Sequence, residues 1–506
     1  MTKKKFLIQG AILTLISIFM RTTNMFFRSY LSGKIGAEGM GLYQLIFSVF
    51  ILAVTLSTSG ISLAVTRIVS SLIATNERGK IRSATSKCLL FCLSLSLFIS
   101  FLFFFCSDFI SINMLHNIKA SKSLKILGFG LPFMSICTCI KGYFLAVDEG
   151  VSCGFAELFE QIITIGGTVL IFTYIPFDNI ETACYFAMIA SSVGEFGSFL
   201  IDIIAMRFSI NRHSPRKEKS KSSGVIKSLS HIALPCTLSS AARSLLSTAE
   251  NLLIPMRLQK GGFSYSQAMS QYGLLQGMAL PILYFPSALI GPFASLLIPK
   301  MCKEKELNHK KAVAHITEKA VSTAVSFGVI TAGYFFMFGD LLSQVFYQNS
   351  NASIYICVLA PLVPLMYLDI VVDCLLKGLD EQLNSMKYNI MDSSIRVVLV
   401  SLLLSAFGMK SYIAIIFMSM IFNCSLSFGK VIKVTGMGFS FLKKFLYQIP
   451  IMIIAINIAW FFPKGENQTR NIIISLIISY SIYALACYVF EKPNKQKSII
   501  HECLRD

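Results

Sequence analysis

The sequence has 506 residues, of which 54% are hydrophobic and only 14% are charged, and its formal net charge is +19. Soluble domains carry about 25% charged residues, so this composition excludes an ordinary water-soluble enzyme or binding domain. The apolar runs are long enough to cross about 30 Å of hydrocarbon as helices, and they lack the alternation of a membrane barrel. The sequence therefore predicts an all-α membrane protein.

About 14 transmembrane helices are predicted in chain order. They cover residues 6–32, 41–73, 84–107, 124–147, 152–174, 183–209, 228–256, 268–299, 312–338, 351–376, 384–407, 411–434, 441–462 and 470–490. The second and eighth spans are longer than a bilayer requires, so each must tilt, bend or project from it. Pro281, Pro286 and Pro292 favour a bend in the eighth span.

Basic residues in the connections indicate how the chain is organised. The largest basic cluster lies between the sixth and seventh spans, and short basic connections face the cytoplasm. We predict a multi-pass protein of the cytoplasmic membrane with both termini in the cytoplasm. Its predicted parts are an N-terminal six-helix lobe at 1–210, a basic cytoplasmic linker at 211–227, a C-terminal six-helix lobe at 228–436, two additional transmembrane helices at 437–490 and a cytoplasmic tail at 491–506.

A weak internal repeat supports the division into two lobes. Gly41-Leu42-Tyr43-Gln44 recurs as Gly273-Leu274-Leu275-Gln276, at the corresponding place in the second span of each half. In transporters built from two such halves, the substrate site lies between them. The basic linker then serves orientation and tethering. No nucleic-acid partner is expected, because no basic helix or aromatic platform accompanies the charge.

Ionisable side chains inside the predicted spans are candidates for function, because each costs at least about 2.5–3.5 kcal/mol on insertion scales. Two of them, in the first span, are seven residues apart and share one helical face, and two in the seventh span repeat that spacing. The predicted substrate-binding residues are Arg21, Arg28, Arg67, Arg243, Glu195 and Glu250.

Arginine is the residue type expected for an anionic substrate. Its guanidinium group stays protonated and offers a planar fork that suits phosphate. Arg21, Arg28 and Arg243 together predict a diphosphate receptor. The alternative is structural: Arg243 pairs with Glu195 to hold helices together, and Arg67 extends to the inner headgroups.

The remaining intramembrane charges suggest contacts between helices. Spacings of four residues allow pairing along one helix, although two close carboxylates can also exchange a proton or bind a cation. These residues are Lys141, Glu157, Glu160, Asp369, Asp373, Asp392 and Arg396.

Enzyme signatures are missing from the sequence. It contains no HExxH, G-x-S-x-G or nucleotide-binding P-loop motif, and we predict no catalytic residue, metal site or cofactor. Without an ATP-binding loop, transport would depend on a coupling cation or proton, the membrane potential or the substrate gradient.

Two segments of the N-terminal lobe resemble a known family. Arg21-Thr-Thr-Asn-Met-Phe-Phe-Arg28 with Gly36-Ala-Glu-Gly-Met-Gly-Leu-Tyr-Gln44, and Gly60-Ile-Ser-Leu-Ala-Val-Thr-Arg67, resemble the stage V sporulation protein B family. That family belongs to the polysaccharide-transporter branch of the multidrug/oligosaccharidyl-lipid/polysaccharide exporter superfamily. Asn24 departs from it, since glycine is usual at this place.

The resemblance implies a fold like that of the lipid II flippases, with two lobes and alternating access. It implies that Arg21 and Arg28 line a cationic cavity and that the two additional helices form a groove for a lipid tail. The expected partners are membrane lipids and a lipid-linked anionic sugar, here a peptidoglycan precursor used in spore cortex formation.

Two other functions are compatible with parts of the sequence. A multidrug cation antiporter of the same fold would use acidic residues such as Glu195, Glu250 and Asp369, although the arginines argue against a cationic substrate. A membrane enzyme that transfers sugars would need an acidic or histidine-containing site at one membrane face, and no convincing candidate is present.

Overall fold

The computed structural model describes most of the chain. The described residues are 3–75, 77–177, 179–213, 225–348, 351–438, 440–461 and 468–503, and side chains are described within 12–438, 446–461 and 468–489. Most of the predicted linker at 211–227, and the side chains of the predicted tail at 491–506, lie outside the described residues.

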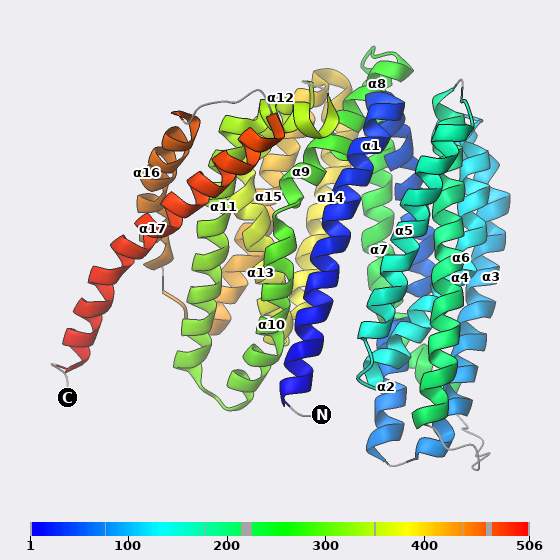
Figure 1. Ribbon diagram of the computed structural model, residues 1–506, viewed down its shortest axis with the longest axis horizontal. Coiled ribbons are helices and arrows are strands. Elements are labelled where there is room, and N and C mark those ends of the chain that lie inside the picture. Colours follow the sequence, from blue (N-terminus) through cyan, green and yellow to red (C-terminus); the bar gives the residue numbers. More distant parts are fainter. Residues whose placement is uncertain are drawn as a thin grey trace. The chain divides into compact units, whose positions relative to one another are not determined.

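Every regular element in this described part of the chain is a helix (Figure 1). The α-helices are α1 (Lys3–Thr58), α2 (Ile61–Ala74), α3 (Ile81–Asn113), α4 (Ala120–Ala146), α5 (Val151–Tyr174), α6 (Ile180–His213), α7 (Val225–Lys260), α8 (Tyr265–Tyr272), α9 (Leu280–Tyr284), α10 (Ser287–Glu306), α11 (Lys310–Tyr347), α12 (Asn351–Leu359), α13 (Val363–Gly378), α14 (Gln382–Phe407), α15 (Met409–Thr435), α16 (Ser440–Phe461) and α17 (Gln468–Cys503). Short 3-10 turns occupy Arg78–Lys80 and Ala360–Leu362, and a π-helix occupies Gly273–Ala279.

The predicted all-α membrane fold is confirmed, and each predicted span coincides with helix. Ten helices among the described residues are long and apolar enough to cross a membrane, and one bent helix pair adds an eleventh. The first of the ten, Ile12–Ala74, contains two predicted spans. The two remaining predicted spans correspond to α7, which is long but more polar, and to the shorter apolar helix Leu446–Phe461.

Three breaks give the long helices their shape. The chain turns inside α1 at Gly36, whose φ of 65° and ψ of −172° suit only glycine. A second break separates α1 from α2 at Gly60, with φ 75°. The third, a bend of 59°, separates Tyr265–Tyr284 from Ser287–Glu306 at Phe285 and Pro286. The predicted bend in the eighth span is therefore confirmed.

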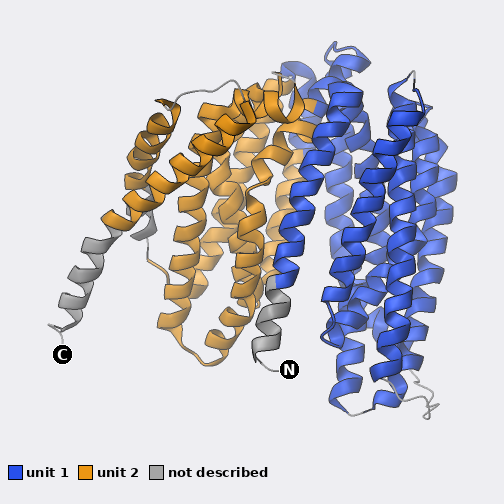
Figure 2. Ribbon diagram, viewed as in Figure 1, with its two compact units in different colours: residues 1–273, 397–408 blue, residues 274–396, 409–506 orange. Residues whose placement is uncertain are grey.

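The chain divides into two compact units (Figure 2). Unit 1 contains residues 1–273 and 397–408, and unit 2 contains residues 274–396 and 409–506. Within unit 1, α7 and α8 pack on α1, which is why the first compact unit extends beyond the sixth span. The lobes at 1–210 and 228–436 stay a prediction.

The packed interior of unit 1 joins α2, α3, α4, α5, α6 and α7. Its members include Val65, Cys88, Cys92, Cys139 and Tyr143, each at most 1% exposed. All three cysteines are free, and in this interior they act as small apolar packing residues.

Basic residues gather at one end of unit 1, where α2 is followed by α3, α4 by α5, and α6 ends. This end carries Arg78, Lys80, Arg82 and Arg212, and we call it the basic end. At the opposite end, the Asn117 amide donates to Glu181 and to the Tyr265 hydroxyl, each at 3.3 Å.

Candidate functional site

All six predicted substrate-binding residues belong to unit 1. The structure places Arg21 and Arg28 on α1, Arg67 on α2 and Arg243 on α7. Three of these arginines are exposed and Arg28 is half-buried. By contrast, Glu195 on α6 and Glu250 on α7 are each only 4% exposed. The exposed groups of the candidate site are therefore the cationic ones.

The turn at Gly36 brings the two halves of α1 side by side. The Arg28 guanidinium donates from Nη1 to Gln44 Oε1 at 3.4 Å. Because the halves run in opposite directions, Arg21, two helical turns before Arg28, lies opposite about residue 51. Arg21 and Arg28 thus occupy two depths along the same helix, as their spacing predicts.

Helix α7 runs along the second half of α1. The Thr248 hydroxyl donates to the carbonyl oxygen of Ser48 at 3.1 Å, and the Thr237 hydroxyl donates to that of Ser59 at 2.5 Å. Between these two contacts, Arg243 lies opposite about residue 53. By this count Arg21 and Arg243 lie at a similar depth, about two residues apart along the second half of α1.

Arg67 and Glu250 lie at other levels of the bundle. The Thr66 hydroxyl, next to Arg67, donates to the carbonyl oxygen of Gly142 at 2.8 Å and so attaches α2 to α4. Glu250 is buried close to Tyr272, with which it interacts electrostatically. Among the described residues, neither Arg67 nor Arg243 has an ion-pair partner.

The structural alternative that pairs Arg243 with Glu195 does not hold in the described residues. The Glu195 carboxyl lies against α4, where Oε2 is 2.1 Å from the position that a Cβ atom on Gly130 would take. It also interacts electrostatically with Glu160 of α5. Arg243 is exposed on α7 instead. Helical periodicity gave no information on which neighbouring helix Glu195 would face.

Sequence reasoning missed one buried carboxyl in unit 1. Asp202 is 3% exposed and follows Glu195 by seven residues on α6. Within the described structure, Glu195 Oε2 and Asp202 Oδ1 are both buried without a hydrogen-bond partner. The seven-residue spacing that grouped Arg21 with Arg28 would also have found Asp202.

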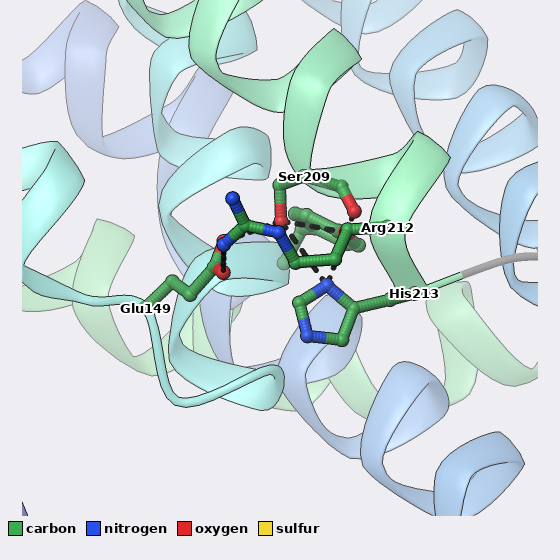
Figure 3. A network of polar contacts seen from close by, with 5 residues as sticks. Glu149, Ser209, Arg212 and His213 are labelled. Atoms are coloured by element: carbon green, nitrogen blue, oxygen red, sulfur yellow. Dashed lines mark hydrogen bonds and ion pairs between the residues drawn. The ribbon is translucent and has the colours of Figure 1, made fainter.

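A polar network fastens the basic end of unit 1 (Figure 3). Ser209 donates to Glu149 Oε2 at 2.5 Å and contacts the buried Tyr143 hydroxyl at 3.2 Å. Arg212 Nη1 lies 3.2 Å from Glu149 Oε1, and His213 Nδ1 lies 3.1 Å from the Ser209 carbonyl oxygen. The network joins the end of α6 to the connection between α4 and α5.

The pairing predicted from the four-residue spacing of Asp392 and Arg396 is present. Asp392 pairs with Arg396 at 3.4 Å in unit 2 and accepts a hydrogen bond from Ser419 at 2.6 Å. Lys141 pairs with Glu157 in unit 1. Asp369 and Asp373 of α13 instead bond to neighbouring helices, since Asp369 accepts from Asn423 and Asp373 from Ser385. No three His, Cys, Asp or Glu side chains among the described residues are placed to hold a metal ion.

The two C-terminal helices of unit 2 pack on α11. A cavity of about 230 Å³ lies between α11, α16 and α17. Its walls include the apolar side chains of Phe338, Trp460 and Ile474 and the polar side chains of Asp340 and Asn471.

Comparison with known proteins connects this site to a family. A family model described as "Polysaccharide biosynthesis protein" matches residues 7–305, which include every arginine of the candidate site. The chain belongs to the polysaccharide biosynthesis protein family.

Relatives of this family member extend the match to its whole length. Stage V sporulation protein B of Bacillus subtilis (strain 168) is 24% identical over 508 residues, covering 98% of each chain. The inward closed structure of the lipid II flippase MurJ has a TM-score of 0.72 at 14% identity, covering 96% of this chain and 99% of that chain. An inward-facing multidrug resistance MATE transporter has a TM-score of 0.67 at 13% identity, covering 84% and 98%. This polysaccharide biosynthesis protein therefore has the fold shared by those transporters.

Proposed function

We propose that this protein is an alternating-access flippase that moves an anionic lipid-linked sugar, a peptidoglycan precursor of the spore cortex, across the cytoplasmic membrane with both termini in the cytoplasm. Family membership, whole-length similarity to a sporulation protein and the flippase fold support this proposal. In this function Arg21, Arg28 and Arg243 bind the diphosphate, and the protein carries out no covalent chemistry.

One observation carries the choice of an anionic substrate. The arginines Arg21, Arg67 and Arg243 are exposed, whereas Glu195 and Glu250 are buried. Arg21 and Arg243, from two different helices, lie at a similar depth within unit 1. Two guanidinium forks at one depth suit a diphosphate, because each fork donates two parallel hydrogen bonds to phosphate oxygens.

The same observation disfavours the multidrug antiporter. A cationic drug requires reachable carboxylates, and the two glutamates of the candidate site are each only 4% exposed. The fold alone does not decide between the two cargoes, since both a flippase and a multidrug transporter resemble this chain.

The cavity between α11, α16 and α17 supports a lipid-linked cargo. Aromatic and aliphatic walls such as Phe338, Trp460 and Ile474 suit an acyl or polyprenyl chain, because burying apolar surface is favourable at about 25 cal/mol per Å². We assign the lipid tail to this cavity of unit 2.

The test measures flipping by the purified protein in liposomes. A polyprenyl-diphosphate muropeptide with a fluorescent head group is placed in the membrane, and a membrane-impermeant quencher reports which leaflet holds it. Arg21→Ala/Arg243→Ala should flip at least about tenfold more slowly than the unmodified protein, since one charge-assisted hydrogen bond contributes about 1.5–3 kcal/mol.

The matched control is Arg207→Ala, because Arg207 is an exposed arginine of unit 1 near the end of α6. It should flip at the unmodified rate. A folded double variant that flips the muropeptide as fast as Arg207→Ala would contradict the arginine site. Protection of cells against cationic dyes, lost on neutralising Glu250, would support the antiporter instead.

A further inference from the structure

The buried carboxyls of unit 1 have no role in the proposed substrate site. Glu195 and Asp202 lie on one face of α6 about 10 Å apart along its axis, and each is at most 4% exposed. In the described structure each has a buried carboxyl oxygen without a hydrogen-bond partner. Such groups are costly to bury, so their presence needs an explanation.

A series of polar groups from three helices connects the two carboxyls. Next to Glu195 lies Glu160 of α5, and the Ser198 hydroxyl donates to the Glu160 carboxyl. The single hydroxyl hydrogen of Ser198 can turn instead toward Cys137 of α4, whose thiol donates to Asp202. The series therefore runs from Glu195 to Asp202 through groups that carry exchangeable hydrogens.

The charges around this series are unbalanced. Lys141 interacts with both Glu160 and Asp202, but it already forms an ion pair with Glu157. Helix α1 reaches α6 near Cys184, about three turns from Glu195. Two carboxyls, Glu160 and Asp202, thus share a cation that is paired with Glu157, and the charged neighbour of Glu195 is another carboxyl, Glu160. A bound proton removes the charge that is costly to bury.

We propose that the coupling ion of transport is a proton and that it binds in unit 1 at Glu195 and Asp202. This inference rests on the proposed transport function and adds its driving ion. Within it, Glu160, Ser198 and Cys137 pass the proton between the two carboxyls. When one carboxyl loses a proton the other gains one, so the number of protons bound to unit 1 stays the same until a proton is released to water.

A proton fits this place better than a metal cation does. A hard cation requires several oxygen ligands around one point, and the described residues contain no group of three acidic, histidine or cysteine side chains placed to hold one. Moreover, Glu195 Oε2 lies directly against the backbone at Gly130, which leaves little space beside this oxygen. The Cys137 thiol is also a poor ligand for hard cations.

The first experiment detects the bound proton without any transport. Infrared spectra of the purified full-length protein, recorded from acidic to alkaline pH, should contain the carbonyl band of a protonated carboxyl. Glu195→Gln and Asp202→Asn should each remove part of this band, and the double variant should remove both parts. Asp108→Asn is the matched control, because Asp108 is an exposed carboxyl of unit 1 paired with Lys125. This control should leave the band unchanged.

The second experiment measures transport in liposomes with a pH-sensitive dye inside. Flipping of the labelled muropeptide should move protons, and a pH gradient should change its rate severalfold, whereas replacing sodium with choline should not. Two results would overturn the proton site and leave the proposed flippase function intact. One is flipping that requires sodium and does not respond to the pH gradient. The other is an infrared band that neither carboxyl variant changes. A titrating band that depends on both carboxyls, in a protein that flips no muropeptide, contradicts the proposed function and leaves the proton site intact.

Discussion

Gly41 and Gly273, the first residues of the repeated Gly-Leu-x-Gln segments, lie against each other where α1 crosses the chain that follows α8. A Cβ atom on Gly41 would lie 2.2 Å from the carbonyl oxygen of Met269, and one on Gly273 would lie 1.9 Å from that of Ala37. The equivalent glycines of the two repeats thus form one contact, in which backbone meets backbone.

This contact predicts that both glycines are sensitive to a single methyl group. Gly41→Ala and Gly273→Ala should each destabilise the protein by about 1–3 kcal/mol, because backbone atoms have little freedom to move away. Thermal unfolding of the purified variants measures the loss. Gly33→Ala is the control: Gly33 also lies in α1, and nothing is within 4 Å of its Cβ position. Equal melting temperatures for Gly33→Ala and Gly41→Ala would contradict the close approach.

A second prediction separates charge from geometry at the arginines. Arg21→Lys and Arg243→Lys keep the positive charge but lose the planar fork, so each should retain only part of the flipping rate. Arg28→Lys should be more tolerated, since Arg28 is half-buried and already bonded to Gln44. The liposome assay measures all three. Full activity of Arg21→Lys with Arg243→Lys would show that charge alone suffices.

Acid should weaken one contact in the connection before α14. The Asn384 amide donates to the Glu381 carboxylate, and Lys430 Nζ lies 3.2 Å from Glu381 Oε1. These two contacts hold the pKa of Glu381 below its usual value. A lowered pKa in the folded state gives stability that is present above the unfolded pKa, about 4.3, and is lost as the pH falls through the folded value.

Glu381→Gln should therefore lower the melting temperature at neutral pH and have little effect in strong acid. Melting curves over a pH series measure this difference. The comparison variant is Glu77→Gln, which breaks an exposed i,i+3 pair with Lys80 and should change stability little at any pH. A pH-independent effect of Glu381→Gln would exclude the ionic contribution.

Reporter fusions test the orientation. A reporter in 147–150, at the basic end of unit 1, should be active only in the cytoplasm, and one in 114–119, at the opposite end, only outside. A reporter after Asp506 should behave like the first. The reverse pattern at 147–150 and 114–119 would refute the proposed topology.

The sequence was sufficient for the architecture because long apolar runs leave helices as the available membrane-spanning form. It also predicted local pairs such as Asp392 with Arg396, since a four-residue spacing places both side chains on one helical face. The break at Gly60 was not predicted, because glycine, unlike proline, is also common inside membrane helices.

Neighbours on different helices were harder to predict. Periodicity shows which residues share a face, but not which helix that face meets. Glu195 was therefore grouped with Arg243, whereas the structure places it against Gly130 and Glu160. Asp202 follows Glu195 by seven residues on the same face of α6, but this spacing does not show whether the face is buried.

The turn at Gly36 also bears on how the chain enters the membrane. Helix continues on both sides of this glycine, so the first two predicted spans are joined without a loop. We expect the insertion machinery to receive them as one helical hairpin, with Arg28 and Gln44 already opposite each other. A polar side chain that is costly for a single helix in lipid would then cross the membrane together with its partner, during synthesis and before the rest of unit 1 exists.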